Sequence, residues 1–478
     1  MHIIYGTHLC KFSSKPSQDV IDAVREMMFY VPEAAKKQAQ LQRWKNKKNG
    51  GKGPIFDPQK CLYDGRSFTF PTGLLAWVRN KLPDIEVVGL PELVEPEDAQ
   101  ALYFGFTPRV GQLEATLALL ASPRSAAVLP CGYGKSKTVA MLAKCLPTSK
   151  ILVTVPATRL LHQNREALSK VLGEVVGILG DSETELTPRV VVATIQSLSR
   201  RVDEADPAVH AWLPTVDVWI SDEAHGSSAE SYRGPSRLMT SAHRRWGLTA
   251  TWGREDGCGL VLEAVLGSKV YERTCEEAIA DGALAPPIIV FKRAPRQKNP
   301  GSPRNFASFY KHNIVENRMR NLQVLLDAAE LVDAGLTPAL VMVRIKDHGK
   351  ALAKLLGAPF VDGDKSSKKT DQILTEFLRG DFPVLVASSV LNVGVDTDKL
   401  VSAVNAASGD SELMAMQKLG RGQRAVPGKT LFVYRDYEDT EPKVLSGHSH
   451  TRKIVYQKNF PGRVKRASLE SVTDLIPG

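Results

Sequence analysis

Short apolar runs alternate with stretches of helical period along most of this chain. From about residue 100 to 285 the runs are AAVLP (126–130), ILVTVP (151–156), VVVATI (190–195), VDVWI (216–220) and WGLTAT (246–251). A strand that is buried on both faces reads as a continuous apolar run, and intervening helices return the chain so that such strands lie parallel. The pattern therefore predicts a parallel sheet covered by helices on both faces.

A second alternation of the same kind begins at about residue 305. Its candidate strands are PALVMV (338–343), DFPVLVASS (381–389), LVSAVNAA (400–407) and KTLFVY (429–434). The segment between the two regions, APRQKNPGSPRN (294–305), is rich in proline, glycine and basic residues, as exposed linkers are. We therefore expect an α/β protein with two parallel-sheet units in tandem.

The residues before the first sheet predict a small α+β domain. A helical pattern covers Gln18 to Met28, and FTFPTGLLAWVRNKL (68–82) changes from strand-like to helix-like at Pro71. The acidic, proline-containing segment LPELVEPEDAQ (90–100) reads as a linker. The expected domains are an N-terminal α+β domain at 1–95, the two sheet units at 100–285 and 305–440, and a basic tail at 441–478 that packs on them.

Composition fits an ordinary globular protein of about three domains, with 478 residues of which 43% are hydrophobic and 24% charged. No apolar run approaches the ~20 residues that span a bilayer, and the first residues lack a signal-peptide pattern. We therefore expect a cytoplasmic protein without membrane contact. The six cysteines include no C-x-x-C pair, which argues against a zinc site or a disulfide framework.

The net charge of +10 is concentrated near the N-terminus. Between Lys36 and Arg66 nine basic residues stand against Asp57 and Asp64, which gives that stretch a charge of +7. Concentrated positive charge is typical of contact with a phosphate backbone.

The same stretch contains QRWKNKKNGGKGPIF (42–56), with a hairpin signal at 49–51. A basic hairpin with an aromatic side chain can follow a nucleic-acid strand and meet an unstacked base, while a flexible charged loop is the alternative interpretation. The residues expected to contact nucleic acid here are Arg43, Trp44, Lys45, Lys47, Lys48 and Lys52.

A candidate phosphate loop follows the first apolar run, in SAAVLPCGYGKSKT (125–138). Gly132 and Gly134 let backbone N–H groups approach phosphates, Lys135 can reach the β- and γ-phosphates, and Ser136 can ligate Mg²⁺. The longer G-x-x-x-x-G-K-[ST] string fails because Leu129 stands at its first glycine. A surface turn is the alternative for G-K-S taken alone.

Two carboxylates end a later strand, in VDVWISDEAH (216–225). A nucleotide hydrolase needs one carboxylate near Mg²⁺ and another that orients or deprotonates water, both at the carboxyl end of a strand. Asp222 suits the first role, as a metal ligand together with Ser136, and Glu223 suits the second. An acidic helix start is the alternative, since such residues favour helix N-termini.

The string Asp222-Glu223-Ala224-His225 spells the DEAH box, and from about residue 105 to 425 the chain resembles a superfamily 2 helicase. The resemblance implies two tandem RecA-like domains, with ATP and Mg²⁺ as cofactors. It implies that Arg109 and Gln112 contact adenine, and that Gly394 and Asp396 in SSVLNVGVD belong to the nucleotide site. The residues that it implies in coupling hydrolysis to movement are His225, Thr249 and Thr251.

The segment from Gln417 to Arg424 matches Q-x-x-G-R-x-x-R, the most specific signal in the chain. Arg421 and Arg424 stand three residues apart and so share one face of a helix. Their charge can stabilise the γ-phosphate in the transition state, and an arginine finger of this kind accelerates hydrolysis by roughly 10³ to 10⁵. An exposed basic helix is the alternative.

Other motifs of the family imply contact with a nucleic-acid strand. They are VPATRLLHQ, ATIQS, VMVRIKDHGKAL and the start of SSVLNVGVD, and the residues they nominate are Thr158, Arg159, Thr194, Gln196, Arg344, Ser388 and Ser389. Three aromatic residues before the first motif, Tyr103, Phe104 and Phe106, can stack on the base or belong to the core.

Segments outside the motor resemble a smaller group. Tyr63-Asp64-Gly65-Arg66 with FPTGLLAWV, and HSHTRKIVY (448–456), are similar to the flanking sequences of bacteriophage UvsW-type recombination helicases. That resemblance implies ATP-driven remodelling of branched DNA: fork regression, Holliday-junction migration, D-loop dissociation and strand annealing. It implies a monomer in the cytoplasm of a bacterial host, with single-strand-binding or recombinase proteins as candidate partners.

Three other functions remain open from the sequence. An RNA helicase would share the motor motifs, and so would the motor subunit of a restriction or repair complex. A nucleotide-dependent DNA-binding module without motor activity would not need Glu223 for turnover.

Overall fold

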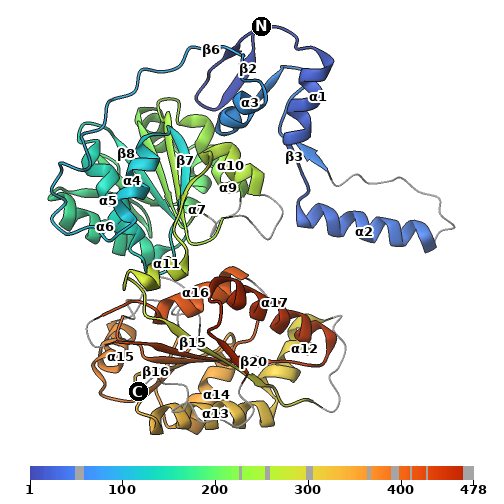
Figure 1. Ribbon diagram of the computed structural model, residues 1–478, viewed down its shortest axis with the longest axis vertical. Coiled ribbons are helices and arrows are strands. Elements are labelled where there is room, and N and C mark those ends of the chain that lie inside the picture. The colour runs from blue at the N-terminus through green and yellow to red at the C-terminus, as the bar shows by residue number, and fades with distance from the viewer. Residues whose placement is uncertain are drawn as a thin grey trace. The chain divides into compact units, whose positions relative to one another are not determined.

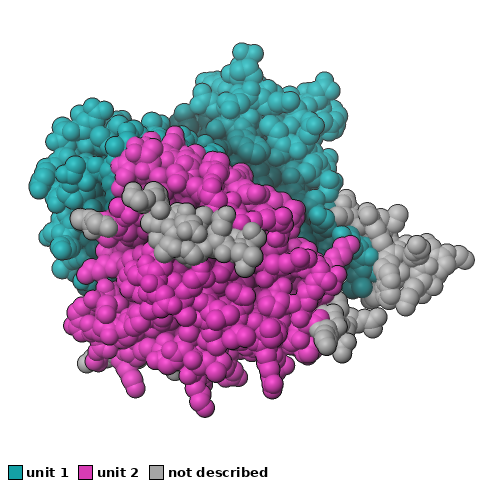
Figure 2. Space-filling model, turned by 60° about the horizontal axis from the view of Figure 1, so that its bottom comes forward, with its two compact units in different colours: residues 1–129, 134–272 teal, residues 130–133, 273–478 magenta. Residues whose placement is uncertain are grey.

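The computed structural model describes residues 1–48, 59–224, 229–252, 259–297, 305–362, 368–388, 398–409, 412–426 and 429–466. It divides into two compact units, coloured separately in Figure 2. The first unit comprises Met1–Leu129 and Gly134–Glu272, and the second comprises Pro130–Tyr133 and Arg273–Gly478. Within the described ranges no helix is both long and apolar enough to cross a bilayer.

An eight-stranded sheet forms the centre of the first unit, and all of its neighbouring strands run parallel except β10. In spatial order the strands are β10 (Glu183–Glu185), β9 (Val176–Gly180), β11 (Val190–Thr194), β8 (Ile151–Val155), β12 (Val218–Asp222), β13 (Arg244–Thr249), β7 (Arg124–Val128) and β14 (Ser268–Glu272). Each apolar run that predicted a strand here overlaps one, which confirms the parallel α/β prediction. Strands such as β8, β11 and β12 are buried at every position, as their unbroken apolar runs require.

Helices cover both faces of this sheet (Figure 1). One face carries α4 (Gln112–Leu120), α5 (Lys135–Cys145) and α6 (Thr158–Leu172). The other carries α7 (Ile195–Asp203), α8 (Pro207–Trp212), α9 (Ala229–Leu238) and α10 (Gly259–Leu266), whose apolar side chains form one cluster with strand residues such as Leu152 and Trp219. Because the central strands are parallel, their carboxyl ends lie together at one edge of the sheet, between the two layers of helices.

The N-terminal domain is a second, smaller sheet in the same unit. Its spatial order is β5 (Thr69–Pro71), β2 (Leu9–Phe12), β1 (Ile3–Ile4) and β6 (Val87–Val88). The predicted helix is confirmed as α1 (Gln18–Met27), and the predicted change at Pro71 is confirmed by the 3₁₀ turn η1 (Thr72–Leu74) and α3 (Leu75–Lys81).

The basic stretch is an excursion between two short paired strands, β3 (Phe29–Tyr30) and β4 (Lys60–Cys61). It begins as the helix α2 (Glu33–Lys48), so the prediction of a hairpin strand before residue 49 was wrong. Alanine, lysine and glutamine dominate this helix and favour helix over strand. The turn signal at 49–51 and Lys52 lie outside the described residues.

The second unit holds a seven-stranded parallel sheet. In spatial order its strands are β17 (Phe360–Val361), β18 (Val384–Ala387), β16 (Ala339–Met342), β19 (Ser402–Asn405), β20 (Phe432–Glu438), β15 (Pro287–Arg293) and β21 (Val464–Arg466). On one face lie α13 (Arg318–Asp333) and α14 (Lys346–Leu356), and on the other lie α15 (Lys368–Arg379), α16 (Glu412–Gly422) and α17 (Lys443–Asn459). This unit is longer at both ends than the expected range of 305–440. Strand β15 precedes residue 305, and both α17 and β21 follow residue 440.

A buried ion pair fixes α17 to the centre of this sheet. Arg452 of α17 is 1% exposed and binds the fully buried Asp436 of β20 through Nε and Nη2, each 2.9 Å from a carboxylate oxygen. Another guanidinium N–H donates to the carbonyl oxygen of Gly409. The segment expected as a tail therefore contributes a core helix.

We predict that Asp436→Ala destabilises the second unit by about 3–5 kcal/mol, because it leaves the guanidinium of Arg452 buried without its carboxylate. Urea unfolding of the full chain should show a lower midpoint for that unit. Lys453→Met is the matched control, since Lys453 lies beside Arg452 but pairs with the partly exposed Glu438 at 3.3 Å. Its effect should stay within about 1 kcal/mol. Equal midpoints for the wild type and Asp436→Ala would contradict the prediction.

Candidate nucleotide site

The phosphate loop lies between β7 and α5, at the carboxyl end of the sheet. Gly132 and Gly134 have φ angles of 81° and 94°, in the left-handed region that side chains disfavour. Gly134 also lies against Gln112, whose Nε2 atom would be 2.9 Å from an added Cβ. Helix α5 begins at Lys135, with Ser136 next along it, and the N-terminus of a helix favours anions such as phosphate.

The two predicted catalytic charges meet in this structure. Lys135, 7% exposed, places its Nζ atom 3.0 Å from Oε1 of Glu223. Glu223 follows β12 directly and has a φ angle of 51°, which is uncommon for a residue with a side chain. Strained backbone of this kind persists where surrounding structure enforces it, often at functional sites.

Asp222 is a buried carboxylate in an unfavourable setting. Burial and the neighbouring charge of Glu223 raise its pKa to about 7, while Lys135 opposes the rise. Asn164 of α6, 1% exposed, also lowers that pKa through its side chain. The sequence reasoning missed Asn164, whose signal is a polar residue on the apolar face of α6 that carries Leu161 and Leu168.

The donor atoms present fit a magnesium ion. Mg²⁺ prefers hard oxygen ligands, and it is commonly held by one or two carboxylates together with substrate phosphates. Asp222 offers a carboxylate whose charge a nearby cation would stabilise, and Ser136 offers a hydroxyl. A magnesium ion held together with substrate phosphates needs only one or two carboxylates from the protein. Among the described residues no group of three or more His, Cys, Asp or Glu could hold a metal ion.

The predicted adenine contact, Gln112, is fully buried at the start of α4. Its Oε1 accepts from the backbone N–H of Arg109 at 2.8 Å, and its Nε2 donates to the carbonyl oxygen of Gly134 at 3.2 Å. The amide therefore connects the segment before α4 with the phosphate loop. Contact of Gln112 or Arg109 with adenine stays a prediction.

The predicted coupling residues Thr249 and Thr251 lie at the end of β13, between β7 and β12. The hydroxyl of Thr249 donates to the carbonyl oxygen of Thr251 at 2.8 Å, and the carbonyl of Thr249 accepts from the N–H of Leu129. This turn is therefore bonded to the strand that leads into the phosphate loop.

Arg424, the last predicted residue of the arginine motif, follows α16 and forms an isolated antiparallel bridge with Leu284 in the second unit. Arg344 is exposed, and its guanidinium lies over the ring of Tyr310. Ser388 is buried, and its hydroxyl donates to Oδ1 of Asp362 at 3.4 Å. The side chains of Arg43, Trp44, Lys45, Lys47, Lys48, Gln417 and Arg421 lie outside the description, as do His225, Ser389, Gly394 and Asp396 entirely.

The candidate strand-contacting residues of the first unit begin two helices at the carboxyl edge of the sheet. Thr158 and Arg159 are the first residues of α6, and Thr194 caps α7 by accepting from the N–H of Ser197 at 3.3 Å. Gln196 is exposed one residue into α7. Helix N-termini at this edge suit phosphate groups, so a backbone-contacting role stays a prediction for these positions.

Of the aromatic residues before Arg109, Phe104 is core and Tyr103 is not. Phe104 is 3% exposed and belongs to the cluster under α4 and α5, whereas Tyr103 is 82% exposed. Phe106 is partly buried and lies beneath the Nζ atom of Lys137.

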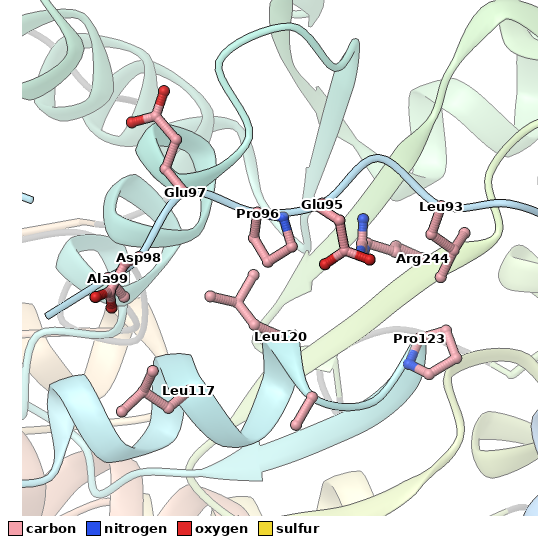
Figure 3. Close-up of a pocket in the computed structure, with 11 residues that line it drawn as sticks. Leu93, Glu95, Pro96, Glu97, Asp98, Ala99, Leu117, Leu120, Pro123 and Arg244 are labelled. Atoms are coloured by element: carbon pink, nitrogen blue, oxygen red, sulfur yellow. The ribbon is translucent and has the colours of Figure 1, made fainter. Parts of the chain in front are cut away.

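A pocket of about 490 Å³ lies between the linker and the start of β13, and neither the phosphate loop nor the acidic pair Asp222 and Glu223 lines it. Figure 3 shows Glu95 and Arg244 close together above the end of α4. Arg244 donates from Nη1 to the carbonyl oxygen of Val94 at 2.6 Å, and burial lowers its pKa. These contacts fasten the linker to β13.

Besides its N-terminal domain, the chain contains two RecA-like α/β folds. Residues 106–254 match the family model described as type III restriction enzyme, res subunit, and residues 328–426 match that of the helicase conserved C-terminal domain. These two matches, in this order along the chain, support a superfamily 2 helicase related to UvsW.

Curated relatives agree with this family. The chain is 29% identical over 364 residues to the DNA 3′-5′ helicase XPB of Kineococcus radiotolerans, covering 71% of this chain and 63% of that protein. It is 23% identical over 422 residues to the ATP-dependent DNA helicase UvsW of Enterobacteria phage T4, with 81% and 80% covered. The chain spans less than two thirds of the first of these relatives.

Solved structures share the fold. A fragment of an HsdR subunit of a type I restriction enzyme from Vibrio vulnificus superposes with a TM-score of 0.57 at 18% identity, covering 77% of this chain and 70% of that one. Dbp5 of S. cerevisiae, bound to RNA and ADP BeF3, has a TM-score of 0.54 at 15% identity, with 77% and 92% covered.

We predict that Lys135→Ala and Glu223→Gln each reduce ATP hydrolysis by at least about 100-fold, since one removes the phosphate-binding cation and the other the group that activates water. Glu223→Gln should still bind ATP, because Lys135 and the loop glycines remain. Steady-state phosphate release and binding of a fluorescent ATP analogue measure the two effects. Glu272→Gln, in an exposed pair with Lys269, is the control. Normal turnover in either variant would refute the site assignment.

Proposed function

We propose that this protein is an ATP-dependent DNA helicase or translocase that remodels branched DNA. The observation that carries the proposal is the meeting of Lys135 with Glu223 at 3.0 Å beside the buried Asp222. A cation for the phosphates, a carboxylate for the water and a carboxylate for Mg²⁺ are the parts that ATP hydrolysis needs. The names of the relatives, DNA helicases and translocases, support DNA as the substrate.

We further propose that the N-terminal domain supplies a duplex or fork contact. Its helix α2 buries Ala35 and Ala39 on one face, while Lys36 and Lys37 are exposed. The remaining lysines of the stretch follow toward residue 52. A protruding basic helix can neutralise backbone phosphates without reading base sequence, as expected for an enzyme that recognises DNA shape.

We propose a role in recombination, repair and replication, with fork regression and Holliday-junction migration as activities, as the resemblance of the flanking segments to UvsW-type helicases implies. We also propose that this protein moves along DNA in the 3′ to 5′ direction, which is the direction in the names of the XPB relatives. We also propose that it acts as a monomer in the cytoplasm, alongside single-strand-binding or recombinase proteins. An RNA helicase and a restriction or repair motor subunit are the competing functions.

The decisive experiment is steady-state ATP hydrolysis at fixed salt without nucleic acid and with single-stranded DNA, duplex, a fork, a four-way junction or RNA. We expect the strongest stimulation from the fork or junction, because only these contain a branch point at which strands are exchanged between duplex arms. Preference for RNA would favour an RNA helicase. Equal stimulation by duplex and junction would remove the case for branch migration and leave a simple DNA translocase.

We predict that neutralising Lys45, Lys47, Lys48 and Lys52 to Gln weakens DNA binding and flattens its salt dependence. Each lost phosphate contact reduces the slope of log affinity against log salt by about 0.9 on duplex DNA. Fluorescence anisotropy with a labelled fork over a salt series measures the slope. Lys269→Gln, which removes an exposed lysine of β14, should leave it unchanged. A wild-type slope in the quadruple variant would show that these lysines do not contact DNA phosphates.

A further inference from the structure

The N-terminal domain contacts the first RecA-like fold at the amino ends of two central strands. Arg124, the first residue of β7, donates through Nη2 to the carbonyl oxygen of Thr7 and through Nη1 to that of Val265 at 3.0 Å. The hydroxyl of Thr7 donates in turn to the carbonyl oxygen of Thr240 at 2.7 Å, just before β13. The loop 5–8 is therefore bonded to segments at the start of both strands.

A second, fully buried arginine supports the same loop from β13. Arg245 donates to the carbonyl oxygens of Ala242, Ser236 and Met239 at 2.9–3.0 Å, and to the hydroxyl of Ser236. That hydroxyl lies 3.2 Å from Nδ1 of His8. These hydrogen bonds of the guanidinium are all made to uncharged oxygen atoms, so the contact depends on geometry.

His8 enters this site as a neutral ring. Burial, and then the charges of Arg245, Arg237, Arg124 and Arg233, lower its pKa to about 4. At neutral pH the imidazole adds no positive charge beside the arginines and can accept a hydrogen bond from Ser236.

An apolar contact adjoins the polar one. Gly73 of η1 lies so close to α10 that an added Cβ would be 2.2 Å from the carbonyl oxygen of Glu263 and 2.6 Å from that of Ala264. Ala264 belongs to the core cluster of the N-terminal domain itself, together with Leu74 and Val78. Trp77 adds a hydrogen bond from Nε1 to the hydroxyl of Ser268 at 2.6 Å. The two domains thus share one core.

These contacts lie at the opposite ends of the strands from the chemistry. Strands β7 and β13 begin at Arg124 and Arg244, and they end next to the phosphate loop and at Thr249. Domains joined by a linker move relative to one another unless their interface is extensive and apolar. Here the apolar contact around Ala264 and several part-buried hydrogen bonds restrict that freedom.

We propose that the loop 5–8 and the turn Thr72–Leu74, which together we call the N-terminal seat, make the N-terminal domain and the first RecA-like fold one rigid body that transmits movement of the motor to bound DNA. This role rests on the DNA-remodelling function proposed above. Gly73, Arg124 and Arg245 act as positioning residues, remote from the nucleotide.

The test is Gly73→Ala, which forces the turn away from backbone atoms that cannot yield. Limited proteolysis in the linker at 89–100, without ATP or DNA, should accelerate by about tenfold or more as the domains separate. DNA-independent ATP hydrolysis should stay within about twofold, while fork remodelling falls about tenfold or more, since displacement by about an ångström suffices for such a loss. Gly65→Ala is the matched control, because its Cβ would meet only Tyr63 at 3.8 Å.

The outcomes separate the seat from the wider function. A wild-type protein that remodels no branched DNA would refute the proposed function, while linker proteolysis still tests the seat. Faster proteolysis with full fork remodelling, or unchanged proteolysis, would overturn the seat. If Gly73→Ala does not fold, Trp77→Phe removes the bond to Ser268 while keeping an aromatic ring in the cluster, and it should shift proteolysis and remodelling in the same directions by about twofold to threefold.

Discussion

The ion pair between Lys135 and Glu223 is the interaction around which the nucleotide site is organised. Two opposite charges that are largely withdrawn from water stabilise each other only while they stay in contact. A triphosphate that enters the site competes with the carboxylate for the ammonium group. In the function proposed here, this pair would hold Glu223 in place before ATP arrives, and ATP binding would replace Glu223 by a phosphate as the partner of Lys135.

Because the central strands run parallel, the first unit has two distinct ends. Their carboxyl ends carry the phosphate loop, the acidic pair and Thr249, while their amino ends carry the arginines that hold the linker and the N-terminal domain. Two successive residues of β13 serve both the linker and the N-terminal domain: Arg244 holds the linker, and Arg245 supports the segment that contacts His8. Successive residues of a strand point to opposite faces, so one side chain holds Val94 and the other Ser236.

The elements that could be predicted are those that a short stretch of sequence determines by itself. Buried parallel strands appear as apolar runs, and glycines with left-handed backbone mark the phosphate loop, so both could be read directly. Strand β15 was missed because it lies next to the linker composition of 294–305, and β21 because it is a three-residue edge strand. Helix α17 was read as a tail because its buried Arg452 looks like a surface charge until Asp436 is placed opposite it.

Contacts between segments distant in the sequence could not be predicted in this way. Asn164 lies beside Asp222 only because α6 packs near the end of β12, and no spacing connects them. The fit of Gly73 against α10 is likewise a property of two surfaces. The motifs therefore identify the chemistry, while the tertiary fold determines which further residues support it.

The paired strands β3 and β4 close the basic excursion at its base, with Tyr30 opposite Lys60. Both ends of the excursion are held by this short ribbon, so its interior can vary in length at little cost, since closure entropy grows only slowly with the number of residues. The excursion, which we propose contacts DNA, is therefore a separable part of the N-terminal domain. Evolution or an engineer can exchange it for another without redesigning the core that carries it.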